Sequence, residues 1–396
     1  MGKKQRILIV GGGFGGVKAA LELCGDDRFD VTLLTDDSDL RYYPTLYHTA
    51  TGSRRANSSI PLTTIFEGKH LNIVQGEAVS VDRKARTVTT KSGDGYGYGT
   101  LVIGLGVVTN YFGIKGMDKY SFSIKTQAEA ARFKKHLHDQ LLKHKAPDLN
   151  YVIVGGGPTG IELAGALPDY IRRIMKNHGV KRRTVHVDLI EALPRLLPRL
   201  PRDTGKLVAR QLRKLGVRIY TGSMVQAATA DNLTVNGKII KSHTVVWTAG
   251  VTNHPFFKEN GFALTNHGKV ATDVYLQAEP DIFVIGDNAN TPYSGLAQTA
   301  LRDGEFVADN LKRKASGKDY KSYRPKKPVT VIPAGPGWAA VIRGRLRLYG
   351  RLGYILREAA DIVGFHDLEP WNKAVPQWYS AFTIDDDCAV CTTAET

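Results

Sequence analysis

Apolar runs that lead into glycines and then into a helix-like pattern occur twice along the chain. The first reads ILIVGGGFGGVKAALEL at residues 7–23, and the second reads YVIVGGGPTGIELAGAL at residues 151–167. Each apolar run is typical of a strand buried in a parallel sheet, and the apolar positions that follow share one face of a helix. The two copies are separated by a constant offset of 155 − 11 = 144 residues. This repeat predicts two copies of one strand–turn–helix unit.

Both copies carry the spacing G-x-G-x-x-G at the predicted turn. The glycines are Gly11, Gly13 and Gly16 in the first copy and Gly155, Gly157 and Gly160 in the second. In this motif the first glycine permits the tight turn, the second lets backbone N–H groups approach a pyrophosphate, and the third lets the helix pack closely. The positive end of the helix dipole then stabilises the pyrophosphate. One copy alone is also compatible with a plain strand-to-helix turn, but two copies in the expected context predict two dinucleotide sites.

An acidic residue at the end of the next strand is expected to bind a ribose in each unit. Asp36 follows a strand-like run at 31–35, and Glu191 follows an alternating run at 185–190. A carboxylate there accepts a hydrogen bond from a 2′-hydroxyl and repels a 2′-phosphate, so Glu191 favours NAD(H) over NADP(H). Arg195 nearby weakens this preference slightly. The alternative for either acid is a solvated strand end.

A third element predicts that one of the two cofactors is a flavin. The run DIFVIGD at 281–287 ends in Gly286-Asp287 and precedes a helical run from Leu296 to Leu311. Asp287 can accept a hydrogen bond from a ribityl hydroxyl while the next helix N-terminus faces the pyrophosphate. The alternative is a turn that only caps the helix. The usual pairing for such sites is FAD with NAD.

Together these motifs resemble the pyridine nucleotide–disulfide oxidoreductase superfamily, and within it the type II NADH dehydrogenases, which are single-chain NADH:quinone oxidoreductases. The resemblance covers residues 5–315. It is carried by ILIVGGGFGG at 7–16, YYPTLYHTATG at 42–52, TNYFGIKG at 109–116, VGGGPTGIELAG at 154–165, VVWTAGV at 245–251, VIGDNA at 284–289 and GLAQTA at 295–300. The resemblance implies an α/β fold with two Rossmann-type dinucleotide-binding domains and a small C-terminal segment.

By position, the FAD-binding domain is expected to be discontinuous, at 1–112 and 265–315, with the NADH-binding domain at 113–264 between its parts. The C-terminal segment at 316–396 is then either a membrane-facing or a dimer-forming element. A homodimer is the expected assembly, and the resemblance implies a quinone as the electron acceptor.

The resemblance also implies roles for single residues. FAD would lie along the first glycine motif and meet Gly286-Asp287, and NADH would lie on the second motif with its ribose on Glu191. The remaining positions are Ala249 and Gly250 on the nicotinamide side, Glu162 near the flavin, and Ala297 and Gln298 at the quinone end. The chain departs from the family at Thr35, which aligns with its strand-end acid, and at Arg302, which aligns with the second glutamine of its quinone signature.

Glu162 and Gln298 are the expected catalytic residues. Glu162 follows the third glycine of its motif by two positions, so it lies on the first turn of a helix, where partial burial would raise its pKa and suit it to proton transfer. Gln298 could donate a hydrogen bond to a quinone carbonyl or a flavin oxygen. The alternatives are an ordinary helix carboxylate and a helix-start residue. No metal-ligand spacing is present, and hydride transfer from NADH to a flavin needs no metal.

Charge adds a candidate membrane surface to this picture. The chain has 54 Lys+Arg and 38 Asp+Glu, a formal net charge of +16. Between Lys312 and Arg357 there are 13 basic residues and one acid. The apolar positions Leu348, Leu352, Ile355, Ala359 and Ile362 recur there as one helix face. A basic amphipathic helix predicts peripheral binding to an anionic membrane at its cytoplasmic face, and the alternative is a domain-packing helix with a solvated basic face.

Three cysteines are too few for a disulfide framework, which indicates a reducing compartment. Cys388 and Cys391 have the spacing of a redox dithiol. They leave open a soluble NADH-dependent reductase of a disulfide or a small redox protein. A basic flavoprotein that binds nucleic acid is a third alternative, but no zinc-finger or RNP-like pattern supports it, so no nucleic-acid partner is expected.

Overall fold

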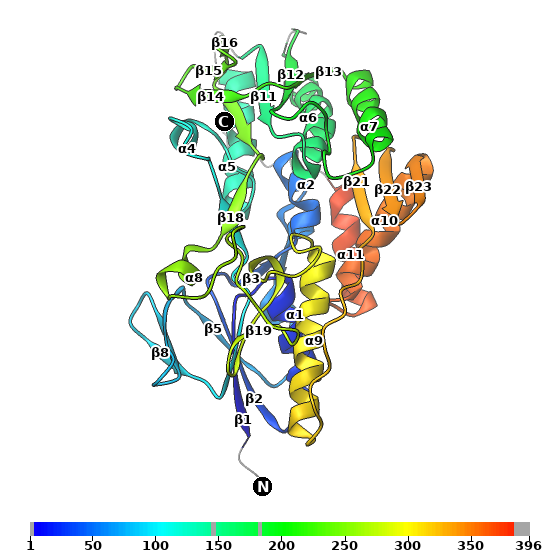
Figure 1. The fold of residues 1–396 in the computed structure, drawn as a ribbon. Helices are drawn as coiled ribbons and strands as arrows, with labels where there is room; N and C mark the ends of the chain where they lie inside the picture. Colours follow the sequence, from blue (N-terminus) through cyan, green and yellow to red (C-terminus); the bar gives the residue numbers. More distant parts are fainter. Residues whose placement is uncertain (1–3, 144–147, 181–183, 384–396) are drawn as a thin grey trace, which may run out of the picture. The chain divides into compact units, whose positions relative to one another are not determined.

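The computed structural model describes residues 4–143, 148–180 and 184–383, and the chain divides into two compact units (Figure 1). Unit 1 comprises the chain up to Arg41 together with Ser59–Val108 and Thr252–Pro328. Unit 2 comprises Tyr42–Ser58, Thr109–Val251 and the chain from Val329. The paired strands β10 (Val107–Thr109) and β18 (Val251–Asn253) contain two of the crossings between the units. The expected cofactor-domain boundaries at 112 and 265 stay a prediction.

A six-stranded sheet forms the centre of unit 1. Its order is β19 (Gln277–Glu279), β20 (Ile282–Val284), β9 (Thr100–Ile103), β1 (Gln5–Val10), β2 (Phe29–Thr35) and β5 (Asn72–Gln75). All strands are parallel to their neighbours except β19, which is antiparallel to β20. The apolar run Ile7–Val10 is exposed by no more than 1% because β1 is an inner strand, between β2 and β9.

Two helices of unit 1 lie side by side, α1 (Phe14–Leu23) and α9 (Ala297–Ala315) (Figure 1). A Cβ on Gly304 of α9 would lie 2.3 Å from the carbonyl oxygen of Gly15 in α1, so glycine permits this close approach. The predicted helix at 296–311 is confirmed as α9. The smaller elements are β3 (Asp39–Arg41), β4 (Ser59–Pro61), α3 (Leu62–Ile65), β6 (Ala78–Asp82), β7 (Thr87–Thr90), β8 (Gly95–Gly97) and α8 (Pro255–Glu259).

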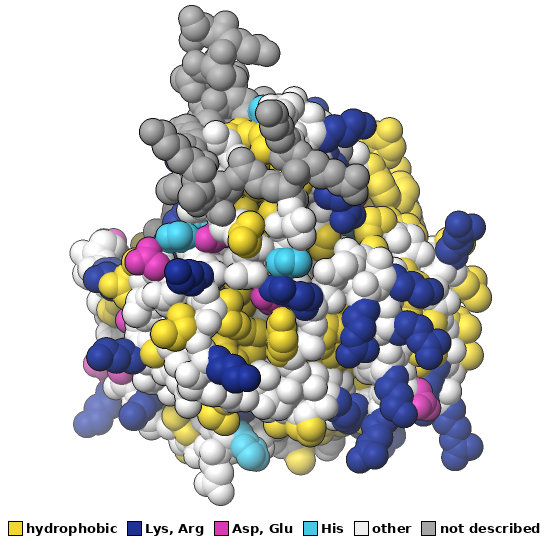
Figure 2. All heavy atoms as spheres, turned by 90° about the horizontal axis from the view of Figure 1, so that it is seen from above, with side chains coloured by type: hydrophobic (Ala, Val, Ile, Leu, Met, Phe, Trp, Pro, Cys, Tyr) yellow, Lys and Arg dark blue, Asp and Glu magenta, His cyan; other side chains and the backbone are white. Residues whose placement is uncertain are grey.

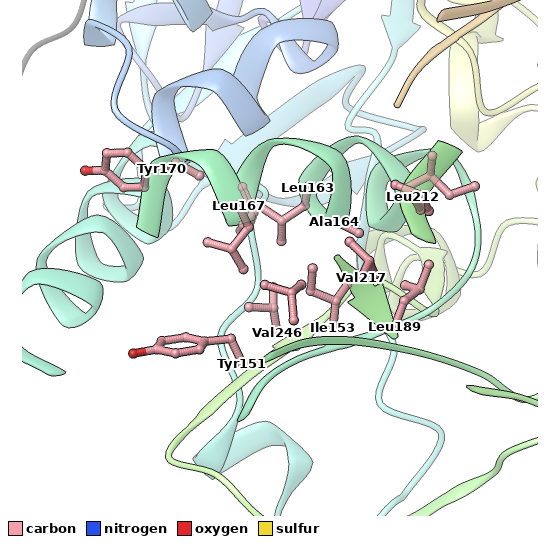
Figure 3. Packing of buried hydrophobic residues seen from close by; sticks show 14 of the residues in the cluster. Tyr151, Ile153, Leu163, Ala164, Leu167, Tyr170, Leu189, Leu212, Val217 and Val246 are labelled. Carbon is pink, nitrogen blue, oxygen red and sulfur yellow. The ribbon is translucent and has the colours of Figure 1, made fainter. Parts of the chain in front are cut away.

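Unit 2 repeats the architecture with a four-stranded parallel sheet. Its order is β13 (Val217–Thr221), β12 (His186–Glu191), β11 (Asn150–Val154) and β17 (Thr244–Trp247). The long helix α6 (Pro158–Asn177) packs on it, with Leu163 and Leu167 facing Ile153 and Val246 of the sheet (Figure 3). The predicted fold class, two Rossmann-type units in an α/β chain, is therefore confirmed.

The other helices and strands of unit 2 are short or lie outside this sheet. They are α2 (Leu46–Ala50), α4 (Met117–Tyr120), α5 (Gln127–His138), α7 (Arg202–Lys214), β14 (Val225–Ala228), β15 (Asn232–Val235), β16 (Lys238–Lys241), β21 (Thr330–Pro333), β22 (Ala339–Arg343), β23 (Leu346–Gly350), α10 (Arg351–His366) and α11 (Trp371–Tyr379). Part of the basic segment thus folds as the antiparallel sheet β21–β22–β23. Leu348, expected on the helix face, lies in β23, because the helix begins only after Gly350 at φ +79°.

Helix α10 buries ionic side chains and exposes apolar ones, which is the reverse of an ordinary packing helix. Its buried positions are Gly353, Arg357, Asp361 and Phe365. The apolar side chains Leu352, Ile355 and Val363 are instead 54%, 63% and 51% exposed. In the described part of the chain, no helix combines the length and apolarity needed to cross a membrane.

Candidate functional site

The two glycine turns have the same geometry. Gly11 and Gly155 adopt φ +112° and +119°, conformations that favour glycine. A Cβ on Gly16 would lie 2.0 Å from the Gly11 carbonyl oxygen, and one on Gly160 would lie 1.9 Å from the Gly155 carbonyl oxygen. The first and third glycines of each motif are thus required by the fold itself.

The middle glycines of the two motifs need a different explanation. Gly13 and Gly157 stand at the N-termini of α1 and α6, and a Cβ on either would meet no protein atom within 4 Å. Nothing in the described chain therefore excludes a side chain at these positions. Open space directly before a helix N-terminus fits a bound pyrophosphate, as the sequence predicts.

The strand-end acids differ between the units. The Glu191 carboxylate accepts hydrogen bonds from the backbone N–H of Gly156 at 2.6 Å and of Leu193 at 2.7 Å, so it lies directly under its glycine turn. In unit 1, the residue under the turn is Thr35, whose hydroxyl would lie 2.4 Å from a Cβ on Gly12. Asp36 is exposed and pairs with Arg41 at 3.2 Å. The role of Asp36 at a ribose stays a prediction.

The other residues predicted to bind FAD also lie in unit 1. Gly286 has φ +66° and its N–H donates to Asp303 at 3.0 Å, while the Asp287 carboxylate accepts from the N–H of Gly295 at 2.9 Å. Ala297 and Gln298 are the first residues of α9. The sequence did not single out Asp303, which also accepts a hydrogen bond from Tyr323 at 2.5 Å. Burial raises the pKa of this carboxyl to about 6.

A cavity of about 110 Å³ lies within unit 2. It is lined by Tyr43, Leu46, Tyr47, Thr109, Ile124, Lys125, Thr159, Glu162, Trp247, Thr248, Gly250 and Val251. The predicted residues Glu162 and Gly250 are thus brought together, and Ala249 lies between two lining residues. The volume of the cavity suits one aromatic ring. The cavity walls combine apolar side chains with a few polar groups, as ligand sites do.

Glu162 is the titratable centre of this cavity. Burial raises its pKa to about 7, and the positive charge of Arg357 opposes this rise. Arg357 is itself buried on α10, where it pairs with Asp361 and donates to the carbonyl oxygen of Pro44 at 3.0 Å. A carboxyl whose pKa lies near neutrality can both give and take a proton at physiological pH.

The neighbouring groups stay neutral at physiological pH. Burial, assisted by the charge of Arg357, lowers the pKa of His48 to about 3. Burial also raises the pKa of Tyr47 far above its ordinary range. Of Glu162, His48 and Tyr47, therefore, only Glu162 changes charge near neutral pH.

Several of these residues were missed by the sequence reasoning. The segment at 42–52 contributed to the family resemblance, but no chemistry was assigned to Tyr43 or Tyr47. Arg357 was expected on a basic surface and is instead 5% exposed. Its spacing of four residues from Asp361 was a signal for a pair on one helix face.

Two other expectations have different outcomes. Arg302 donates to the carbonyl oxygen of Lys326 at 2.9 Å, so its guanidinium is used within unit 1.

Cys388 and Cys391 lie outside the described residues. Within the described ranges, no group of His, Cys, Asp and Glu could hold a metal ion.

Comparison with known proteins places these features in a family. Residues 5–304 match the family described as pyridine nucleotide-disulphide oxidoreductase. A curated relative from Staphylococcus saprophyticus is 27% identical over 383 residues, which cover 90% of this chain and 94% of the relative. A second from Staphylococcus epidermidis is 27% identical over 390 residues, covering 92% and 96%. Both relatives are named type II NADH:quinone oxidoreductase.

Solved structures share the fold. The structure of NDH2 from Plasmodium falciparum in complex with NADH has a TM-score of 0.86 at 18% identity, covering 96% of this chain and 98% of that one. The sulfide:quinone oxidoreductase of Aquifex aeolicus has a TM-score of 0.76 at 19% identity, covering 97% and 98%. These similarities extend over the whole fold, including the C-terminal region.

Proposed function

The chain belongs to the pyridine nucleotide-disulphide oxidoreductase family, and from this premise we propose that it is an NADH:quinone oxidoreductase with FAD as its resident cofactor. The curated relatives that cover nine-tenths of the chain bear the name of this activity. The observation that carries the proposal is the repeated glycine turn, whose middle glycine faces open space in both units. Two dinucleotides account for two such turns.

The residues of unit 1 fit FAD. The turn at Gly11–Gly16 leaves room for a pyrophosphate, and Asp287 stands at the turn before α9 with its carboxylate oriented by Gly295. FAD supplies the redox chemistry, in which a hydride is accepted from NADH and two electrons are passed to the acceptor. Asp303 and Tyr323 hold the Gly286 loop in place.

The residues of unit 2 fit NADH. Gly157 leaves space at the N-terminus of α6, and the Glu191 carboxylate keeps lone pairs for ribose hydroxyls beyond its two backbone hydrogen bonds. The cavity next to Thr248 and Gly250 has room for a ring. The Thr248 hydroxyl donates to the Val154 carbonyl oxygen at 2.9 Å, which orients this side chain in the cavity wall.

Glu162 is the proposed proton-transfer group, because quinone reduction takes up protons as well as electrons. Arg357 moderates its pKa, which keeps both charge states accessible near neutrality. Gln298, at the start of α9, is the proposed donor to a quinone carbonyl. Its side-chain amide can donate without a change in charge.

Stopped-flow spectroscopy tests the proposal directly. Anaerobic NADH should bleach the flavin absorbance of the purified holoenzyme within milliseconds to seconds, and a short-chain quinone should restore it. An oxidised disulfide substrate in place of quinone tests the alternative reductase. If only the disulfide restores the absorbance, and Cys388→Ser with Cys391→Ser abolishes this, the quinone proposal is wrong.

We further propose peripheral binding to an anionic membrane. The apolar side chains Leu352, Ile355 and Val363 of α10 are more than half exposed, although the buried face of the same helix holds Arg357 and Asp361. Apolar residues turned outward and ionic residues turned inward suit a helix whose outer neighbour is lipid.

Basic residues accompany this apolar face. We define the basic surface as Arg202 and Lys206 of α7 with Arg343, Arg345 and Arg347 around the β22–β23 turn, all of which are exposed. Thr204 and Tyr349 join the two elements through a 2.9 Å hydrogen bond. Lys and Arg are also far more frequent than acidic residues on the face seen in Figure 2. This charge favours an anionic leaflet, and the proposed location is the cytoplasmic face of the cell membrane as a homodimer.

A further inference from the structure

Arg195 lies in the turn that follows the strand-end acid of unit 2. Its Nη1 donates to the carbonyl oxygens of Leu197 at 3.2 Å and Leu200 at 2.9 Å, and its Nη2 donates to the carbonyl oxygen of Pro198. One guanidinium thus binds three backbone carbonyls within five residues. We call this arrangement the arginine clasp.

The clasp encloses a strained residue. Leu197 has φ +50°, a conformation that leucine rarely adopts, and its side chain is only 2% exposed. Such a conformation persists only where its surroundings hold it. The three carbonyls bound by Arg195 supply that restraint, because the Leu197 carbonyl is one of them.

The clasped turn supports the glycine motif directly. The Leu197 N–H donates to the Gly156 carbonyl oxygen at 3.0 Å, while the Gly156 N–H donates to Glu191. The backbone N–H and C=O of Gly156 are therefore both hydrogen-bonded to the segment 191–197. A Cβ on Gly156 would also lie 2.6 Å from the Leu196 side chain, so the turn and the motif are in close contact.

We propose that Arg195 is a positioning and selectivity residue for the dinucleotide: it holds the 195–200 turn under the second glycine motif and is thereby withheld from the 2′-phosphate of NADPH. This rests on the NADH site proposed above. The positive charge of Arg195 therefore does not offset the repulsion between the Glu191 carboxylate and a 2′-phosphate. The site is then selective for dinucleotides with a free 2′-hydroxyl.

Binding of two non-reacting fragments tests the proposal. Calorimetry on the full-length holoenzyme measures the affinity for ADP-ribose and for 2′-phospho-ADP-ribose. The wild type should prefer ADP-ribose by about tenfold or more, since like charges in contact are disfavoured. In Arg195→Ala both affinities should fall together by about tenfold and their ratio should stay constant, because one shared support is lost. Selective loss of the phosphorylated fragment would show that Arg195 binds the phosphate and would overturn the proposal.

Two further variants keep the test informative. Arg195→Lys keeps the charge but lacks the fork that reaches several carbonyls, so it should behave like Arg195→Ala. Full ADP-ribose affinity in this variant would contradict the clasp. Arg199→Ala, which removes an exposed arginine of the same turn, is the matched control and should change neither affinity.

Hydrogen exchange gives a readout that does not depend on any ligand. The Leu197 amide should exchange about tenfold faster in Arg195→Ala than in the wild type, because its turn opens more often. Unchanged exchange would overturn the positioning role. If the wild type binds neither fragment while exchange at Leu197 still rises in the variant, the dinucleotide site fails and the clasp stands.

Discussion

Thr35 occupies in unit 1 the position that Glu191 occupies in unit 2. Each is the last residue of the strand next to the motif strand, and each lies against the middle of its glycine turn, with Thr35 Oγ1 2.4 Å from a Cβ on Gly12 and Glu191 Oε2 2.9 Å from a Cβ on Gly156. A hydroxyl therefore replaces a carboxylate under the first turn, and the acid follows one residue later at Asp36.

This difference predicts unequal effects of removing the two acids. Glu191→Ala should raise the Kd for NAD+ tenfold or more, since a charged hydrogen-bond acceptor contributes about 1.5–3 kcal/mol. Asp36→Ala should raise the Kd for FAD only a few-fold, because its carboxylate is exposed and paired with Arg41. Calorimetry with NAD+ and reconstitution of the apoprotein with FAD measure these values. Equal losses in the two variants would contradict the assignment.

The glycines of the second motif predict a separation of stability from binding. Gly160→Ala places a Cβ 1.9 Å from a backbone oxygen, so it should destabilise the protein by about 1–3 kcal/mol and lower its thermal midpoint. Gly157→Ala meets no protein atom, so its thermal midpoint should match the wild type while the Kd for NAD+ rises. Unchanged NAD+ affinity in Gly157→Ala would rule out the proposed approach of the pyrophosphate.

Glu162 predicts a pH dependence of quinone reduction. Its carboxyl is protonated below about pH 7 and ionised above it, so turnover limited by proton donation should fall as pH rises through 7. Glu162→Gln should be slower and should lack this inflection, which steady-state assays between pH 5 and 9 detect. An unchanged inflection in the variant would assign it to another group.

The raised pKa of Glu162 also predicts that the free energy of unfolding changes with pH. Its folded-state pKa of about 7 exceeds the ordinary value of 4.5, so folding takes up a proton between these values. The contribution to stability is present below about pH 4.5 and is lost as pH rises through 7, a change of roughly 3 kcal/mol. Thermal midpoints of the wild type should therefore fall over this range relative to those of Glu162→Gln, and parallel curves would contradict the raised pKa.

A close contact between Tyr42 and Gly364 predicts a non-additive pair of substitutions. A Cβ on Gly364 of α10 would lie 2.2 Å from the Tyr42 hydroxyl oxygen but 3.4 Å from its ring carbon Cζ. Gly364→Ala should lower the thermal midpoint by several degrees, and Tyr42→Phe combined with it should restore most of the loss. Additive effects would show that another contact limits this position.

The basic surface predicts the strength of membrane binding. Replacing Arg343, Arg345 and Arg347 by Gln should weaken partition to vesicles containing phosphatidylglycerol by about 3 kcal/mol, near 1 kcal/mol per charge. Sedimentation with vesicles measures this, and NADH-dependent bleaching should not change. Lys238→Gln with Lys241→Gln, at two exposed positions of β16, is the control for loss of charge elsewhere. Equal weakening per charge removed would mean that net charge, and no particular surface, directs binding.

The sequence was informative where structure depends on neighbouring residues. The two strand–turn–helix units were predictable because the apolar runs, the glycines and the helix pattern are contiguous. The helix that carries Glu162 was predictable from its distance to Gly160, but the expected place of Glu162 on the first turn was wrong, because α6 already begins at Pro158 and has no acidic residue in its first turn. The burial of Arg357 was not predictable, since its four-residue spacing from Asp361 indicates only a pair on one helix face, whereas its burial also depends on the contact with Pro44, far away along the chain. The pocket wall at Tyr43 and Tyr47 depends on contacts equally remote along the chain.

Sequence separation from the glycine motif could not identify which residue lies under the first turn. Asp36 has the expected separation from its motif, but the pairing of Val10 with Leu34 in β1 and β2 matches that of Val154 with Ile190 in β11 and β12. The next residue in each case is Thr35 and Glu191. Register within the sheet therefore decides which side chain lies under the turn, and register is a property of paired strands.

The division of the chain between the units has a consequence for its synthesis. The chain passes between them after Arg41, Ser58, Val108, Val251 and Pro328. The turn at Gly335 packs against helix α6 at Gly165. A Cβ on Gly165 would lie 2.4 Å from the backbone nitrogen of Gly335. A growing polypeptide thus cannot finish either Rossmann unit before most of it has left the ribosome. The sheet-facing side of α6 is covered once β17 has formed, but the side at Gly165 that packs against β21 stays uncovered for seconds longer at ordinary elongation rates.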